Sequence, residues 1–333
     1  MEILDFKEVL ESKDEKNIVL GNGFSIAYDI AFEESKFSWN TLSELCEINQ
    51  NSPLFELLKD SNFDFELAHQ KLNGACEVIS KYGDSTLLID KYQNEIQTLR
   101  EQLVIAVTKS HPENFSNLAM SNGKKVRESI GKCRDFIGQF DNVFSLNYDL
   151  LLYWVRCYEG NYLGVDSFNK VNRELLFSEA DDANIFFPHG ALFLTRHGVS
   201  ARKTSNSDQD PILNRTIRNI QSGVFPLCVS EGTGEQKKKA IFSNEYLSFC
   251  YKSISRSKGV FFTFGCSFMD EKDDHIIEAM LRSPTELIVV GEYKPNSESY
   301  HRLLHAFEKV QNRQGVRNPK KVVIADTSSV SVW

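Results

Sequence analysis

Four short motifs hold the residues of this 333-residue sequence whose types are suited to chemistry. They are Gly21–Ser25, Ser145–Asp149, Pro188–Gly190 and Gly265–Asp270. Each motif follows a short hydrophobic run rich in β-branched and aromatic residues. Because these runs do not alternate between polar and apolar residues, they predict strands buried on both faces, as in a parallel sheet. Ligands bind at the carboxyl ends of such strands, so the four motifs predict the functional site.

The first motif, Gly21-Asn22-Gly23-Phe24-Ser25, is a glycine turn that follows a predicted strand. Glycines at such a turn let backbone amides approach a pyrophosphate, and Ser25 can donate a hydroxyl. The full dinucleotide fingerprint is not met, because Ile26 stands at its third glycine position and no clear ribose-binding acid follows about 20 residues later. A plain tight turn therefore remains an alternative interpretation.

In the second motif, Asn147 and Asp149 place an amide and a carboxylate two residues apart at a strand end. Asp149 suits the cap of a helix predicted to start at Leu150. Capping does not explain Asn147, which would be a buried amide in need of a partner. Both interpretations stay open, a functional pair and a simple cap.

His189 ends the predicted strand Ile185–Phe187 and precedes Gly190, which can adopt unusual dihedral angles. A neutral imidazole at a strand end can act as a general base near pH 7. A purely structural histidine is the alternative. His189 is therefore the candidate base of the sequence.

The fourth motif is a second glycine turn that leads into a predicted helix. Ser267 suits a phosphate contact, and Asp270 or Asp274 suits the start of the helix. Cys266 invites interpretation as a nucleophile, although no separate base that would activate it is evident.

In this order on strand ends, the four motifs resemble the NAD-binding core of the SIR2-like (sirtuin) superfamily. They resemble its bacterial branch, which includes the NADases of anti-phage defence, more closely than the deacylases. The helix predicted over 246–254, with Phe262–Gly265 and Asp274–His275, also resembles an uncharacterised bacterial subfamily of that branch. The resemblance spans almost the whole chain.

The resemblance implies that NAD+ is the substrate and is hydrolysed to nicotinamide and ADP-ribose. It implies that Asn147 holds the nicotinamide ribose and the attacking water, that Asp149 binds the carboxamide, and that His189 is the base. An oxocarbenium-like ribose would be stabilised by oriented dipoles and a nearby base. The remaining residues implied to bind NAD+ are Gly21, Asn22, Gly23, Phe24, Ser25, Gly265, Ser267 and Glu292.

Two departures from the deacylating sirtuins argue against acyl-lysine substrates. The seven cysteines include no C-x-x-C pair, so the sequence predicts no zinc module and no metal. Phe24–Asp29 replaces the Gly-Ile-Pro-Asp-Phe-Arg type sequence that follows their glycine loop. In addition, a strand ends in Gly291–Glu292, where many sirtuins have an asparagine that binds the adenosine ribose. The choice between NAD+ and another nucleotide as the ligand therefore stays open.

The predicted fold is a single α/β domain over residues 1–333 with a Rossmann-like parallel sheet of the SIR2 type. Residues 42–140 carry an almost wholly helical pattern, which predicts a large insertion between the first two strands. Its apolar stripes, such as Phe63-Phe65-Leu67, suit either an interface or ordinary packing.

The composition excludes several classes of protein. Hydrophobic residues make up 41% and charged residues 25% of the chain, which is typical of a globular protein. A net charge of −8 gives no basis for a nucleic-acid or membrane surface. The N-terminal residues lack a signal core, and an odd number of cysteines suits reduced thiols, so we expect a cytoplasmic protein. The one basic run, Lys237–Lys239, is predicted to lie in an exposed loop.

We therefore expect a NAD+ glycohydrolase that acts in bacterial anti-phage defence by abortive infection. The first alternative is a catalytically idle subunit that senses NAD+, ADP-ribose or another nucleotide. The second is a hydride-transferring dehydrogenase, which the missing third glycine and ribose acid disfavour. Unrestrained consumption of NAD+ would kill the host, so we expect a homo-oligomer, an activating partner subunit, or both, contacting the helical insertion.

Overall fold

The computed structural model describes thirteen stretches of the chain. They are residues 3–11, 14–33, 47–61, 65–83, 85–111, 124–158, 162–205, 210–222, 224, 226–229, 233–268, 271–314 and 319–333. The chain divides into two compact units. The sheet unit comprises Met1–Glu34, Phe115–Ser205 and Pro226–Trp333, and the helical unit comprises Ser35–Asn114 and Asn206–Phe225.

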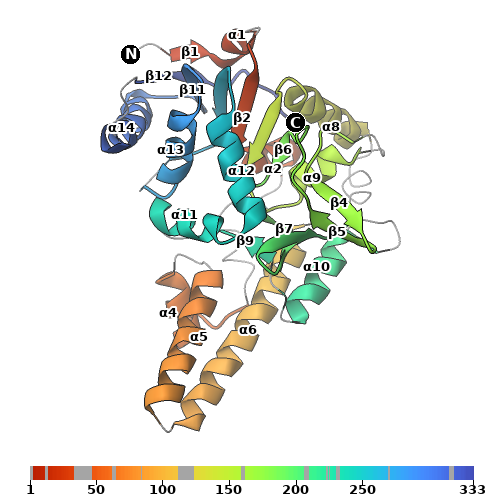
Figure 1. Cartoon of the computed structure of the whole chain (residues 1–333), viewed down its shortest axis with the longest axis vertical. Coiled ribbons are helices and arrows are strands. Elements are labelled where there is room, and N and C mark those ends of the chain that lie inside the picture. Colours follow the sequence, from red (N-terminus) through yellow and green to blue (C-terminus); the bar gives the residue numbers. More distant parts are fainter. Residues whose placement is uncertain are drawn as a thin grey trace. The chain divides into compact units, whose positions relative to one another are not determined.

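In the described part of the sheet unit, seven parallel strands form the central sheet (Figure 1). In spatial order they are β1 (Ile3–Asp5), β12 (Lys321–Asp326), β11 (Leu287–Glu292), β10 (Val260–Phe264), β2 (Lys16–Leu20), β3 (Asn142–Ser145) and β6 (Ile185–Phe186). β10 is buried at every position, and β2 and β3 at every position but the first. The α/β class and the parallel sheet predicted from the hydrophobic runs are confirmed, and the arrangement is Rossmann-like.

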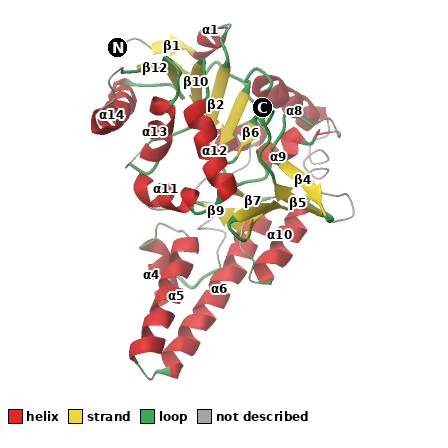
Figure 2. Cartoon of the chain, viewed as in Figure 1, coloured by secondary structure: helices red, strands yellow, loops and turns green. Residues whose placement is uncertain are grey.

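The described helices of the sheet unit are coloured red in Figure 2. They are α1 (Phe6–Leu10), α2 (Gly23–Phe32), α8 (Lys124–Ile137), α9 (Leu151–Arg156), α11 (Gly234–Phe242), α12 (Glu245–Arg256), α13 (Asp274–Arg282) and α14 (Ser297–Gln314). The loop predicted for Lys237–Lys239 is wrong, because these residues lie in α11 and Lys237 is buried. A capping box between Thr233 and Gln236 starts this helix.

A second, antiparallel sheet was not predicted. In spatial order its strands are β4 (Phe168–Val171), β5 (Glu174–Phe177), β8 (Ser200–Lys203), β7 (Gly190–His197) and β9 (Pro226–Cys228). Gly190 begins β7 with a φ of +78°, and a Cβ there would lie 1.8 Å from the carbonyl oxygen of Leu227. Gly190 is therefore required for the close pairing of β7 with β9, which fixes the position of the preceding His189.

The described helical unit consists of α4 (Pro53–Lys59), α5 (Phe65–Tyr82), α6 (Thr86–Ser110) and α10 (Ile212–Gln221). α5 and α6 form a hairpin with its own apolar core, made by Ile48, Leu54, Leu58, Ala68, Leu72, Ile96 and Leu99. The predicted insertion over 42–140 thus includes helices of this unit, but also α8, which belongs to the sheet unit. The side chains of Phe63, Phe65 and Leu67 lie outside the described residues. Across the described residues, no helix is both long enough and apolar enough to span a bilayer.

Candidate functional site

The two glycine turns meet backbone against backbone at the carboxyl ends of β2 and β10, which are neighbours. The Gly21 N–H donates to the carbonyl of Phe264, and the Gly23 N–H donates to that of Gly265, both at 2.9 Å. Gly265 has a φ of +68°, and a Cβ on it would lie 2.4 Å from the Gly23 Cα. Any side chain at Gly265 would therefore clash and strain the backbone.

A chain of hydrogen bonds joins the first glycine turn to the end of β3. The Asn147 Nδ2 donates to the Gly21 carbonyl at 3.0 Å and to the Ser25 Oγ at 2.9 Å. The Ser25 hydroxyl donates in turn to the Asp149 Oδ2 at 2.5 Å. Ser25 and Asn147 are both buried. The structure thus brings together the first glycine turn, Asn147 and Asp149, and gives Asn147 the partners that a buried amide needs.

Asp149 bonds to the start of the following helix, as a cap would, and also to Ser25. Its Oδ1 accepts the N–H of Leu151 at 2.9 Å, at the start of α9, while its Oδ2 accepts the Ser25 hydroxyl. Burial raises the pKa of Asp149, the bonds from Ser25 and Leu151 lower it, and the nearby charge of Asp29 raises it again. The net result is a pKa above the ordinary value for aspartate.

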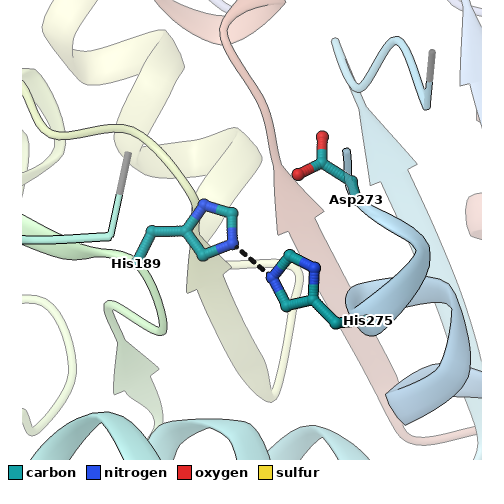
Figure 3. Close-up of side chains that lie close together, drawn as sticks. All are labelled: His189, Asp273 and His275. Carbon is teal, nitrogen blue, oxygen red and sulfur yellow. Dashed lines mark hydrogen bonds between the residues drawn. The ribbon is translucent and has the colours of Figure 1, made fainter. Parts of the chain in front are cut away.

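His189 is buried, and its ring faces two neighbours. Its Nε2 lies 2.8 Å from the Nε2 of His275 (Figure 3). A hydrogen bond with the backbone of Leu146 raises its pKa, and because Nε2 faces His275 we assign that bond to Nδ1–H. Burial, followed by the charge of Lys237, lowers the pKa of His189 well below its ordinary value. His189 is therefore neutral at pH 7, as a general base requires.

His275 is the second member of this histidine pair, and Asp273 lies close to both imidazoles. His275 lies in the first turn of α13, and its backbone carbonyl accepts the Tyr251 hydroxyl at 3.0 Å. Asp273 precedes α13, and its Oδ1 accepts Lys237 Nζ at 3.1 Å. The sequence marked His275 only as part of the family resemblance, since no local pattern indicates contact with a residue 86 positions away.

Arg302 contacts two of the predicted site residues, Ser267 in the second glycine turn and Glu292. It donates to the backbone carbonyl of Ser267, and its Nη2 lies 3.5 Å from Glu292 Oε1 at the end of β11. Burial raises the pKa of Glu292, and Arg302 lowers it. Asp270 lies outside the described residues. The sequence did not single out Arg302, because it sits in α14 without a recognisable motif.

Phe24 and Cys266 are core residues. The Phe24 ring is fully buried 5.1 Å from the ring of Trp333, whose indole N–H donates to the Phe24 carbonyl at 3.0 Å. Cys266 is buried, its thiol lies 3.6 Å from the Val19 carbonyl oxygen, and burial raises its pKa. The nucleophile interpretation of Cys266 is therefore wrong, because nucleophilic attack needs an accessible thiolate.

Several groups expected to bind phosphate already have partners within the protein. The N–H groups of Phe24 and Ser25 donate to the carbonyls of Gly21 and Asn22, both at 3.0 Å, and Gly23 is bonded to Gly265. A hollow of about 560 Å³ lies against β5, α11, α12 and the β7–β8 turn, and none of the predicted site residues lines it. A phosphate that binds the N–H groups of Gly23, Phe24 or Ser25 must therefore compete with existing hydrogen bonds.

The comparisons with known proteins give a family and no activity. No curated protein matches the sequence. A protein family described as a domain of unknown function (DUF4917) matches residues 18–333, a range that includes every predicted site residue. The chain therefore belongs to the DUF4917 family.

Proposed function

We propose that this protein is a NAD+ glycohydrolase. The observation that carries the proposal is the buried hydrogen-bonded chain from Asn147 through Ser25 to Asp149, which lies at adjacent strand ends beside a glycine turn. Parallel α/β sheets bind nucleotides at this edge. The order of the motifs resembles the NAD-binding core of the sirtuin superfamily, which supports NAD+ as the nucleotide.

The proposed reaction is hydrolysis of the bond between nicotinamide and ribose. Water attacks the ribose C1′, the C1′–N bond breaks, and its electron pair goes to the nicotinamide nitrogen. One proton of the water passes to a base, so the products are nicotinamide and ADP-ribose. The barrier falls most where fixed dipoles face the positive charge that develops on the ribose.

The contacts of Asn147 suit this reaction. Both hydrogens of its amide are used, on Gly21 and on Ser25, so the Oδ1 atom is the acceptor for a ribose hydroxyl or the attacking water. Asp149, with its raised pKa, would accept or donate a hydrogen bond at the carboxamide. His189 is neutral and would take the proton.

The decisive experiment follows nicotinamide release from NAD+ by chromatography, with Asn147→Ala beside a matched control. Asn17→Ala is that control, because Asn17 is also buried and donates to two carbonyls, those of Lys258 and Val260, but it lies at the opposite end of β2. We expect wild-type protein and Asn17→Ala to release nicotinamide, and folded Asn147→Ala to bind NAD+ without turnover. Full turnover by Asn147→Ala contradicts the proposal.

A second candidate, a nucleotide-sensing subunit without turnover, is favoured by a separate observation. The Ser25 hydroxyl, the Gly23 N–H and both ring nitrogens of His189 all have partners within the protein. Such a site suits a resting or signalling state. Binding of NAD+ or ADP-ribose by calorimetry, with no nicotinamide released alone or with candidate partners, would select this function.

As part of the proposed function, NAD+ depletion serves anti-phage defence and is restrained by assembly. The turn of the α5–α6 hairpin carries exposed apolar side chains, which are 58% exposed for Val78, 87% for Tyr82 and 82% for Leu87. Apolar residues grouped at one exposed tip are typical of an interaction surface. We propose that a second copy of this chain binds there, and that isolated chains have low basal activity.

A further inference from the structure

The inference concerns three buried or half-buried side chains that meet in space from distant parts of the chain: His189, Asp273 and His275. One ligand atom of each, an imidazole nitrogen or a carboxylate oxygen, lies within 4.8 Å of the others. Figure 3 shows the two imidazoles meeting nitrogen to nitrogen, with the Asp273 carboxylate beside the His275 ring. Two imidazoles and a carboxylate are a recurrent ligand set for divalent transition metals.

The distance between the two imidazoles suits cis ligands of one ion. Metal–nitrogen bonds of about 2.05 Å place two nitrogens about 2.9 Å apart at right angles, as in an octahedral site, and about 3.3 Å apart in the tetrahedral geometry usual for Zn2+. The Nε2 atoms of His189 and His275 are 2.8 Å apart. The carboxylate is at most 4.8 Å from either nitrogen, and it can lie opposite only one of two cis nitrogens, so Asp273 must move closer to the imidazoles on binding.

The neighbours of these residues provide the outer contacts that metal ligands have. The Nδ1–H of His189 is assigned to the Leu146 backbone, which leaves the Nε2 lone pair directed at His275. A ligating histidine typically donates its other nitrogen to a backbone carbonyl in this way. Asp273 accepts Lys237 through Oδ1, so Oδ2 remains as the ligand atom.

The protonation states also suit a metal, since ligands bind in their deprotonated forms. Burial is the largest cause that lowers the pKa of both His189 and His275, so neither ring loses a proton on binding. With His189 bonded to Leu146 through Nδ1–H, the 2.8 Å contact makes His275 Nε2–H the donor, so binding of an ion requires this proton to move to Nδ1. The buried Nδ1 of His275 has no hydrogen-bond partner among the described residues, so no existing bond is broken when it takes the proton. The charge of Lys237 repels a cation, so the ion is expected to exchange and to be removed by EDTA.

We propose that His189, Asp273 and His275 form a binding site for one divalent transition metal of the Zn2+, Co2+ or Ni2+ type. Imidazole ligands disfavour Mg2+ and Ca2+, which take oxygen ligands. The consequence for catalysis rests on the proposed function. Because the ion takes the Nε2 lone pair and ties His189 to α13, a bound metal inhibits NAD+ hydrolysis, and the metal-free protein is the more active form.

The first test measures binding alone, so it does not depend on hydrolysis. EDTA-treated, dialysed full-length protein is titrated with Co2+ and followed by visible absorption, and Zn2+ is counted by elemental analysis after gel filtration. His301 and His305 are both exposed on α14 four positions apart and form a second chelating pair, so all proteins carry His305→Ala. We expect one metal per chain in this background.

Variants in the same background assign the site. His275→Gln and Asp273→Asn each keep the size of the side chain, and we expect at least a tenfold loss of Co2+ affinity in each. His197→Gln, which removes an exposed histidine of β7, should bind as the background does. Circular dichroism identifies the folded variants. Absence of Co2+ binding in the folded background, or unchanged binding in folded His275→Gln, overturns the proposed site.

The second test separates the two proposals. We expect Zn2+ to slow nicotinamide release at least tenfold in the background protein and much less in His275→Gln. Metal binding without any hydrolysis supports the site and contradicts the proposed function. Hydrolysis that is unaffected when Zn2+ is bound overturns the inhibitory role.

Discussion

The Ser25 hydroxyl donates to the Asp149 carboxylate at 2.5 Å across 124 positions of sequence. This bond joins the helix after β2 to the segment after β3, and the same hydroxyl accepts from Asn147. One small side chain therefore holds both the amide and the carboxylate of the candidate site. Removal of this side chain should therefore lower both the stability of the fold and the proposed activity.

We expect Ser25→Ala to lower the free energy of unfolding by about 1–3 kcal/mol, because the Asp149 carboxylate and the buried Asn147 amide each lose one of their two hydrogen-bond partners. It should also raise the pKa of Asp149 further, since the serine bond lowers it. Ser253→Ala is the control, because within the described part of the chain its hydroxyl bonds only to the Phe249 carbonyl of α12. Chemical denaturation measures both, and equal effects would contradict the central role of Ser25.

His189→Ala should reduce nicotinamide release by about 10²–10⁴-fold, the usual loss when a general base is removed. His197→Ala should retain the wild-type rate, because His197 is exposed on β7. The measurement is turnover of NAD+ with EDTA-treated protein, in which no metal competes for the base. A folded His189→Ala protein with near wild-type turnover would remove His189 from the mechanism.

Gly265→Ala should destabilise the fold by about 2 kcal/mol or more, because the substitution combines a positive φ with a backbone clash. The added Cβ would lie 2.4 Å from the Gly23 Cα. Gly131→Ala is the matched control, because Gly131 sits inside α8 and no heavy atom of the described residues, apart from the adjacent backbone of its own helix, lies within 4 Å of a Cβ there. Alanine in a helix interior should stabilise by up to about 1 kcal/mol. Thermal unfolding of the two variants tests the difference in sign.

Acidification should destabilise the metal-free protein as pH falls below about 6.5, the ordinary pKa of histidine. Burial lowers the folded-state pKa of His189 and His275, so the unfolded state binds protons first. Stability is therefore complete above the unfolded pKa and is lost as pH falls toward the folded values, by up to about 1.4 kcal/mol per pH unit for each histidine.

The control for this pH dependence is the double variant His189→Gln and His275→Gln, whose stability should fall less between pH 7 and pH 5. His69 of α5 also has a lowered pKa and contributes equally to both proteins. Denaturation midpoints across this range provide the comparison. The same slope in both proteins would contradict the assignment of these two histidines.

Leu87→Glu should weaken self-association, because a charge at an apolar interface must be desolvated without a partner. Leu87 is 82% exposed near the α5–α6 turn. Val199→Glu is the control, since Val199 is 66% exposed in the turn between β7 and β8 of the sheet unit. Sedimentation velocity of both variants against concentration measures the effect, and a monomeric wild-type protein would contradict the proposed interface.

The parallel sheet was predictable because each of its strands has a recognisable local sequence pattern. Runs such as Val260–Phe264 are buried along their whole length, so they need no information from distant residues. The antiparallel sheet was not predictable in this way. β4 is mostly exposed and β5 is only partly buried, so their sequences lack a clear pattern of either kind.

The candidate site was predictable one strand end at a time. Asn147 and Asp149 stood out because an amide and a carboxylate followed an apolar run, and the contact with Ser25 follows from the pairing of β2 with β3. The partners of His189 and Glu292 could not be predicted from the sequence. His275 and Arg302 come from helices, and their contacts depend on packing rather than on a motif.

The position of β2 in the sheet also bears on when the protein can act during its synthesis. β2 is made before its neighbour β10, and 243 residues separate Asn17 from Val260 where the two strands are bonded. At about 5–20 residues per second, a ribosome needs roughly 10–50 seconds to cover that interval. Throughout it the Gly265 turn does not yet exist, so the nascent chain cannot assemble the candidate site until β10 and this turn have been made.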